Sequence, residues 1–340
     1  MTELILTKLT QNANRSLKTL SENPLVSILV PSFNQGRFIR ATIDSILQQD
    51  YRPLRIHVID GGSKDETVDV LRSYGDIPEL TWISEPDKGV VDAVNKGFRL
   101  VTGDIIGIQS SDDTYLPGAI GQAVEALRNH SACGLVYGDT VKIDAAGHEL
   151  SRSQIGPFSL ENFFLFRTWI PQPSAFFRRE MLDICGGWDD RVPYAADTDL
   201  WLRMMFRCGV QKIDAFWSQR RIHDSQRDTQ VAKISRDFCR MIDQSADIAT
   251  TTPDIQRLAR ATKHLIQLRY NSTGSDWNAA WHLWKAGCIA PEVRNFPGVL
   301  VHLALPVRRW GSRMKQAIAA SAGERHTAVP KDAADCQTQK

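Results

Sequence analysis

Residues 25–60 read LVSILVPSFNQGRFIRATIDSILQQDYRPLRIHVID, and this stretch sets the expectation for the fold. Its first part, 25–31, is dense in β-branched residues and predicts a buried strand. Residues 37–49 carry apolar side chains at helical spacing, and 54–60 predict a second strand. A strand, a helix and another strand in this order indicate a parallel βαβ unit.

The same alternation continues on the carboxyl side of this unit. Residues 80–84 and 104–109 predict two more strands, separated by a helix over 88–101. Ser63 and Glu66 have the spacing of a capping box, which predicts the start of a helix that ends near residue 74. The chain is therefore expected to be an α/β protein with a doubly wound, mainly parallel sheet flanked by helices.

Beyond residue 116 the pattern is less regular. The expected elements are a helix over 116–128, strands over 135–143, 173–177 and 210–222, a helix over 197–208, a hairpin turn at 144–147, and mainly helices from residue 229. The domain organisation follows from these shifts: a lead over 1–23, a catalytic domain over 24–228 with halves 24–116 and 117–228, a helical region over 229–320, and a disordered tail over 321–340.

Composition excludes several classes of protein. The chain has 340 residues, and 41 Lys and Arg against 39 Asp and Glu give a net charge of +2, which argues against a nucleic-acid partner. The 6 cysteines are widely spaced without a CxxC pair, as expected of reduced thiols in the cytoplasm rather than of disulfides or a zinc site. No stretch resembles a signal peptide or a membrane span.

Polar residues follow each of the four predicted parallel strands. They are Ser32 to Asn34, Asp60 to Ser63, Glu85 to Lys88, and Ser110 to Asp113. Because ligands of such sheets bind beyond the carboxyl ends of the strands, these four ends are expected to line one crevice.

The last of these ends contains two adjacent carboxylates, in the sequence QSSDDTYLP over 109–117. Asp112 and Asp113 repel each other unless a cation or a shared proton relieves them. Oxygen ligands on a loop suit Mg²⁺ or Mn²⁺, which usually arrive with phosphates. The alternative is that the pair only caps the following helix.

Taken in order, several motifs resemble family 2 glycosyltransferases of the GT-A fold. They are LVSILVPSFNQGRFIRATIDSILQQDY, HVIDGGSKDET, EPDKGVVDAVNKG, SSDD, DTDLWLR and a late Arg-x-His segment, together spanning about residues 24–225. The resemblance implies a GT-A-like sheet with a helical C-terminal extension. It also implies inverting transfer of a sugar from a nucleotide-sugar to an acceptor hydroxyl, with a divalent cation, Mn²⁺ or Mg²⁺.

The resemblance also assigns residues to the donor site. Pro31 and Phe33 stand where the family meets the base, and Asp60 where it binds a uracil-like ring. The other nucleotide or donor residues are Gly61, Asp87, Lys88, Asp112, Arg220 and Arg221. Asp113 is expected to be the metal ligand, with His223 as a further ligand or diphosphate contact. Asp60 as a turn residue and His223 as a structural residue are the alternatives.

Inverting transfer needs one carboxylate that takes the acceptor's proton. The family usually has Glu-Asp where this chain has Ala196-Asp197, so we assign the base to Asp197. Asp199 is turned about 200° away on the same helix and is expected to be an orienting partner or a cap. Both carboxylates capping the helix is the alternative.

Gln172, Trp188 and Tyr194 are candidate contacts to the acceptor or donor sugar. Stacking of an aromatic ring on a sugar would account for Trp188, whereas a place in the core is the alternative for both Trp188 and Trp201.

The sequence therefore predicts a metal-dependent inverting glycosyltransferase that uses a UDP-sugar in cell-surface polysaccharide or glycolipid synthesis. Its acceptor would be a saccharide or a lipid-linked saccharide. A nucleotidyltransferase that makes nucleotide-sugars and a non-catalytic nucleotide-sugar-binding scaffold are the alternatives. Apolar and then basic residues within 295–320 suit peripheral contact with the inner face of the cell membrane, against the alternative of an ordinary helical subdomain.

Overall fold

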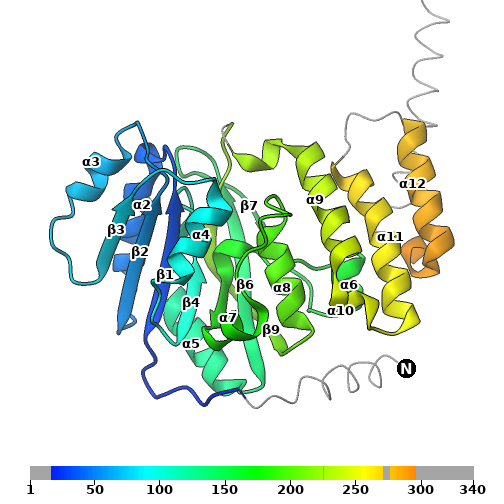
Figure 1. Ribbon diagram of the computed structural model, residues 1–340, viewed down its shortest axis with the longest axis horizontal. Helices are drawn as coiled ribbons and strands as arrows, with labels where there is room; N and C mark the ends of the chain where they lie inside the picture. Colours follow the sequence, from blue (N-terminus) through cyan, green and yellow to red (C-terminus); the bar gives the residue numbers. More distant parts are fainter. Residues whose placement is uncertain (1–16, 225, 271–275, 296–340) are drawn as a thin grey trace, which may run out of the picture.

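The computed structural model describes residues 17–224, 226–270 and 276–295, and is built around one nine-stranded sheet (Figure 1). The strand order is β3-β2-β1-β4-β8-β6-β9-β5, with β7 paired to β6. The strands are β1 (Val26–Ser32), β2 (Leu54–Asp60), β3 (Leu80–Ser84), β4 (Ile105–Ile108), β5 (Thr114–Tyr115), β6 (Cys133–Ile143), β7 (Glu149–Ser153), β8 (Ala175–Arg178) and β9 (Gly209–Arg221).

The sheet has a parallel half and a mixed half. β3, β2, β1 and β4 are all parallel, as the strand–helix alternation predicts. β8 is antiparallel to both β4 and β6, whereas β9 is parallel to β6. This confirms the predicted α/β class, and the four predicted parallel strands lie within two residues of their expected bounds.

Helices cover both faces of the sheet (Figure 1). They are α2 (Gly36–Leu47), α3 (Thr67–Arg72), α4 (Val90–Phe98), α5 (Ala119–Asn129), α6 (Leu160–Phe164), α7 (Glu180–Cys185), α8 (Ala196–Met205), α9 (Val231–Gln244), α10 (Ala246–Ala249), α11 (Pro253–Tyr270) and α12 (Asp276–Ile289). Single 3₁₀ turns occur at η1 (Gln172–Ser174), η2 (Arg227–Thr229) and η3 (Pro291–Asn295).

Successive residues of β1 point to opposite faces, and both faces are buried. Ile28 and Val30 belong to the core under α2 and α5, whereas Leu29 belongs to the core that includes α4 and α8. All three side chains are fully buried, and burial of each stabilises the fold by about 1.5–3 kcal/mol. A strand buried on both faces reads as a continuous apolar run, which is what residues 25–31 show.

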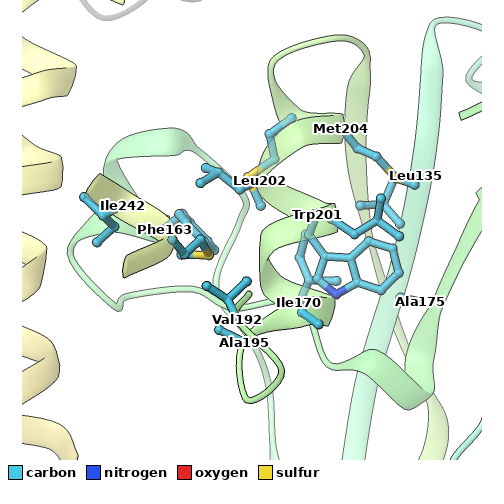
Figure 2. Close-up of a cluster of buried hydrophobic side chains, with 14 of the residues drawn as sticks. Leu135, Phe163, Ile170, Ala175, Val192, Ala195, Trp201, Leu202, Met204 and Ile242 are labelled. Atoms are coloured by element: carbon cyan, nitrogen blue, oxygen red, sulfur yellow. The ribbon is translucent and has the colours of Figure 1, made fainter. Parts of the chain in front are cut away.

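Helix α8 lies between the sheet and the C-terminal helices. Figure 2 shows Trp201 next to Leu135 of β6 and Ala175 of β8, while Leu202 faces Phe163 and Ile242. Trp201 is 1% exposed and Trp188 8%. Both tryptophans are therefore core residues, and the prediction that Trp188 stacks on a sugar does not fit its burial.

The predicted capping box at Ser63 and Glu66 is wrong. Helix α3 begins only at Thr67, and its N-terminus has no side-chain cap. The Ser63 hydroxyl donates to Asp60 instead and accepts a hydrogen bond from the Asn34 amide at 2.7 Å. Ser63 thus joins the loops after β1 and β2, a tertiary contact that local sequence does not signal.

The C-terminal helices pack on the rest of the protein through α6 and α8. The Thr262 hydroxyl on α11 donates to the Phe164 carbonyl at 2.7 Å, and Arg207 after α8 pairs with Asp247 at 2.6 Å. Among the described residues, no helix is both long and apolar enough to cross a bilayer. The predicted membrane-contact segment, 295–320, lies outside the described residues except for Asn295, and the predicted tail, 321–340, lies wholly outside them.

Candidate active site

The carboxyl ends of three parallel strands bring a row of polar residues together. The register aligns Ser32 with Asp60 and Asp60 with Ser84. Asp60 is fully buried, and its carboxylate accepts hydrogen bonds from the Gly62 and Ser63 amides and from the Ser63 and Ser84 hydroxyls. A carboxylate accepts about four hydrogen bonds, and Asp60 already accepts four. A nucleotide base that binds Asp60 would therefore have to replace one of these hydrogen bonds. The base-binding role of Asp60 stays a prediction.

Gly61 is placed where a side chain could not fit. A Cβ built at Gly61 would lie 2.6 Å from an Asp87 carboxylate oxygen. Asp87 in turn accepts the Gly89 amide at 2.8 Å, which shapes the turn into α4. Lys88 next to it is exposed. The predicted donor residues Gly61, Asp87 and Lys88 therefore lie together, between the ends of β2 and β3 and the start of α4.

The first loop contributes a buried and an exposed residue to the same end of the sheet. Pro31 is buried within β1, and Phe33 after the strand is 56% exposed. Asn34 has a φ of 53°, and its side-chain oxygen accepts the Lys64 amide at 2.9 Å. The loop is thus held to its neighbour after β2, which leaves the Phe33 ring in solvent at the edge of the site.

Pairing of β5 with β9 brings the acidic pair to the residues after β9. Thr114 is opposite Gln219, and the two strands run antiparallel. As a result, His223 Nε2 lies 2.9 Å from Asp112 Oδ2, although 111 residues separate them. The Phe38 ring, with its centroid 4.9 Å from that of His223, supports the imidazole from α2.

Asp113 points into the protein, unlike Asp112. It is 4% exposed, and its Oδ1 accepts the Arg221 amide at 2.8 Å. Burial raises the pKa of Asp113 well above its usual value, the neighbouring Asp112 raises it further, and the Arg221 amide and Arg220 act against the shift. The backbone is held as well, since the Thr42 hydroxyl donates to the Asp113 carbonyl at 2.7 Å. Through these contacts Asp113 anchors the loop between β4 and β5.

Arg221 is committed to the backbone. It is 6% exposed, its Nε donates to the Asp112 carbonyl at 2.9 Å, and a terminal nitrogen donates to the carbonyls of Asp144 and Ala145. The guanidinium also lies 5.0 Å from the Phe38 ring centroid. The predicted diphosphate contact of Arg221 stays a prediction, since two of its three guanidinium nitrogens already donate to backbone carbonyls and Nε among them holds the loop that carries Asp112. Arg220, the preceding residue, acts electrostatically on Asp113.

The residues present fit a divalent cation with two protein ligands. Asp112 Oδ2 and His223 Nε2 lie 2.9 Å apart, a hydrogen-bond distance, so a cation bound here would replace that contact and be held by the same two atoms. The part of the chain that the structure describes holds no group of three or more His, Cys, Asp or Glu side chains suited to a metal. Mg²⁺-type sites commonly use one or two protein ligands and take the remainder from phosphates and water.

The predicted base lies in the first turn of α8. Oδ1 of Asp197 accepts the Thr198 amide at 2.7 Å, and no side chain caps the helix. Asp199 instead pairs with Arg203 at 2.7 Å, and Arg203 donates to the carbonyls of Cys185 and Gly187. Burial raises the pKa of Asp199, and Arg203 acts against that shift. Asp199 therefore braces the loop before α8, while the Asp197 carboxylate keeps an oxygen for other partners.

The loop after β9 links the acidic pair to the predicted base. His223 begins this loop beside Asp112, and Arg227, four residues later, interacts electrostatically with Asp197. Of the predicted acceptor contacts, Gln172 binds the Ile108 carbonyl and the Ser110 hydroxyl at the end of β4. Tyr194 is half-buried near Arg227, with the guanidinium 5.0 Å from its ring centroid.

Several residues that build this site are absent from the sequence-based assignment. Phe38 and Thr42 are buried on one face of α2, where Phe38 fits the apolar helical pattern and nothing in the local sequence marks either residue as part of a site. Arg227 and Lys233 gave no local signal, because only the fold places them around Tyr194. The Arg-x-His segment was the one late motif that pointed to this loop.

A glycosyl transferase family 2 model matches residues 27–185. An uncharacterised glycosyltransferase of Mycobacterium tuberculosis (strain ATCC 25618 / H37Rv) is 34% identical over 56% of this chain and 72% of its own length. The chain belongs to glycosyl transferase family 2. It is therefore a glycosyltransferase, and the nucleotidyltransferase and scaffold alternatives are set aside.

Other relatives of this family 2 enzyme have more specific names. A PGL/p-HBAD biosynthesis glycosyltransferase of M. tuberculosis (strain ATCC 25177 / H37Ra) is 30% identical over 53% of this chain and 69% of its own length. Chondroitin synthase of Escherichia coli is also 30% identical, over 55% of this chain and 27% of its own length.

Solved structures agree with the GT-A-type fold. S. aureus TarS 1–349 in complex with UDP-GlcNAc has a TM-score of 0.61 at 12% identity, covering 86% of this chain and 92% of that one. The mannosyltransferase PcManGT from Pyrobaculum calidifontis, in complex with GDP-Man and Mn²⁺, has a TM-score of 0.58 at 20% identity and covers 94% of both chains. At these identities the likeness concerns the fold.

Proposed function

We propose that this family 2 enzyme is a metal-dependent inverting glycosyltransferase that moves a sugar from a UDP-sugar to an acceptor hydroxyl. The observation that supports this proposal most directly is the pairing of Asp112 with His223 at 2.9 Å, at the carboxyl ends of the strands. A carboxylate oxygen and an imidazole nitrogen this close together would both hold a single Mn²⁺ or Mg²⁺ ion. The Mn²⁺ in the complex of the structurally similar mannosyltransferase supports the same proposal.

We assign the metal-ligand role to Asp112 and His223, and a structural role to Asp113. This changes the sequence-based assignment, which gave the ligand role to Asp113. Asp113 is almost fully buried and holds the Arg221 amide, whereas the Asp112 side chain is 15% exposed beside His223. When bound, the cation would supply Lewis-acid stabilisation of the leaving diphosphate.

In the proposed mechanism the protein's own residues position the donor and remove a proton. Asp60 and Gly61 shape the pocket for the base, which we take to be uracil. Asp87 and Lys88 approach the donor from the start of α4. Asp197 accepts the proton of the attacking acceptor hydroxyl as the new bond forms on the face opposite the leaving group. Arg221 keeps the loop of Asp112 in place throughout.

The test is a calorimetric titration of the full chain with UDP, TDP and GDP, each with and without Mn²⁺. We expect Mn²⁺-dependent binding of UDP that weakens at least tenfold in Asp112→Asn and His223→Ala. Asp76→Asn is the matched control, because Asp76 is exposed in the turn before β3. Equal UDP affinity with and without Mn²⁺, or full affinity in Asp112→Asn, would overturn the metal assignment. Failure of the folded protein to bind any diphosphate would overturn the donor assignment.

We further propose that the enzyme builds a cell-surface polysaccharide or glycolipid at the inner face of the membrane. On α12, Trp281 is 48% and Trp284 60% exposed, and tryptophan favours the membrane–water interface. Co-sedimentation with anionic vesicles is expected to fall in Trp281→Ser/Trp284→Ser. Equal sedimentation of both proteins would contradict the membrane role of this helix.

A further inference from the structure

A row of basic side chains leads away from the predicted base. Lys233, Arg236 and Arg240 are exposed on α9 at helical spacing, so they share one face of that helix. Arg227 of η2 is exposed just before the helix and extends the row. We name these four residues the basic ridge. Helix α9 runs beside α8 on the side away from the parallel strands (Figure 1).

The ridge begins at Tyr194, three residues before Asp197. The Arg227 guanidinium lies 5.0 Å from the Tyr194 ring centroid, and the Lys233 ammonium lies 5.4 Å from it. Lys233 also donates to the Tyr194 hydroxyl at 3.3 Å. The Tyr194 backbone is fixed in turn, because its amide donates to the buried Asp237 at 3.0 Å. Two cations are thus held on one ring, next to the residue proposed to deprotonate the acceptor.

The ridge carries four positive charges, and acidic groups offset only part of them, with Asp197 and Asp237 both attracting Arg227. Among the described residues, Arg236 is the one member of the ridge with an ion pair, to Asp237 at 3.0 Å. Arg227 and Arg240 donate to the carbonyls of Pro193 and Arg191, which leaves their charge in place. The whole chain has a net charge of only +2, so such a concentration is local.

Like charges this close together raise the energy of the free protein, and an anion relieves that cost. A solvated helix face would account for Arg236 and Arg240 alone. It does not account for the convergence of Arg227 and Lys233, from separate elements, on one ring. Arg227 is within electrostatic reach of Asp197, and Tyr194 precedes Asp197 by three residues, so an anion bound at Tyr194 would lie on the same side of α8 as the proposed base.

We propose that the acceptor is an acidic saccharide, and that its phosphate or carboxylate group binds the basic ridge at Tyr194. This inference rests on the proposed function, because it takes Asp197 as the base and this side of α8 as the acceptor side. It assigns Arg227, Lys233 and Arg240 as specificity-determining residues for that acceptor.

The experiment measures binding of defined saccharides to the full chain in the presence of UDP and Mn²⁺. Mannopentaose, its phosphomonoester and tetragalacturonate serve as the neutral, phosphate and carboxylate probes. Lys233→Ala/Arg240→Ala is compared with wild type and with Arg99→Ala, whose exposed arginine lies at the far end of α4. Vesicles of phosphatidylglycerol and phosphatidylcholine form a separate arm, and UDP affinity is titrated in every variant.

We expect at least one acidic probe to bind wild type about tenfold more tightly than mannopentaose, with an affinity that falls as salt is added. The double variant should lose that preference, while Arg99→Ala keeps it and all variants keep their UDP affinity. The preferred acidic probe then identifies phosphate or carboxylate as the anion.

Three results would overturn the inference. The first is equal affinity of wild type for neutral and acidic probes, and the second is an equal loss in Arg99→Ala. The third is ridge-dependent binding of vesicles without binding of any acidic saccharide, which would make the ridge a lipid-binding surface. If wild type binds no UDP, the proposed function itself fails, and that result is distinct from all three.

Discussion

Substitution of Asp113 separates an anchoring role from a metal-binding one. Asp113→Ala removes the acceptor of the Arg221 amide, a bond of 2.8 Å inside the protein. An unsatisfied buried donor costs about 1–3 kcal/mol, so the free energy of unfolding should fall by about that amount. Asp113→Asn keeps an oxygen at the same place and should regain most of the loss. Urea denaturation of the three proteins measures both effects.

The pH dependence of the free energy of unfolding tests the burial of Asp113 separately. Burial and the neighbouring Asp112 raise the pKa of Asp113 in the folded protein above 3.8, the value of an exposed carboxyl. The folded protein therefore binds this proton more tightly than the unfolded chain does. The stabilising contribution is complete at low pH and is lost as the pH rises through the folded pKa. Asp113→Asn lacks this titration, so its stability relative to wild type should increase as the pH rises.

The assay is urea denaturation at a series of pH values, paired with UDP titration in Mn²⁺. Because the metal ligand is proposed to be Asp112, Asp113→Asn should keep Mn²⁺-dependent UDP binding. An Asn variant as unstable as Asp113→Ala would refute the hydrogen-bond argument. A stability difference that shrinks with rising pH would refute the charge argument, and loss of Mn²⁺-dependent binding would restore the ligand role to Asp113.

Three further substitutions test other parts of the site and the core. Asp197→Asn should slow UDP release from the UDP-sugar by about 10²–10⁴-fold without changing UDP affinity, as measured by coupled UDP detection; an unchanged rate would exclude Asp197 as the base. Arg221→Lys cannot reproduce the three hydrogen bonds that Arg221 donates to carbonyls. It should lower the free energy of unfolding by about 1–3 kcal/mol and weaken Mn²⁺-dependent UDP binding. An unchanged UDP affinity in calorimetry would count against the positioning role of Arg221. Arg178→Met leaves the carbonyls of Lys18, Leu127 and Cys133 without this donor, so thermal unfolding should occur several degrees lower, and an unaltered midpoint would contradict that account.

The parallel half of the fold could be predicted because its signals are local. Apolar runs, helical periodicity and turn residues are set by neighbours a few positions apart, and β1, β2, β3 and β4 follow them closely. The polar residues expected at the carboxyl ends of these strands do lie there, whereas the crevice they were expected to line stays a prediction. The register places Ser32, Asp60 and Ser84 in one row there.

The antiparallel strands and the roles of individual carboxylates depended on tertiary structure. Asp112 lies in a turn that the Asp113 amide closes by donating to the Ser110 carbonyl at 3.1 Å, and the sequence Asp112-Asp113 does not reveal which of the two side chains is buried. Pairing of β5 with β9 decides it, by placing the Arg221 amide on Asp113 and His223 on Asp112.

By itself, then, the sequence determined the α/β class, the polar residues at the carboxyl ends of the parallel strands, and the family resemblance that the comparisons bear out. Only the tertiary structure decided which carboxylate faces His223, that Arg221 binds backbone carbonyls and Trp188 is buried, and that Arg227 and Lys233 meet at Tyr194. The physical reason is the separation along the chain between the residues that interact. Strands and helices follow from nearby residues, whereas burial and charge pairing at the site arise between segments that are as many as 111 residues apart.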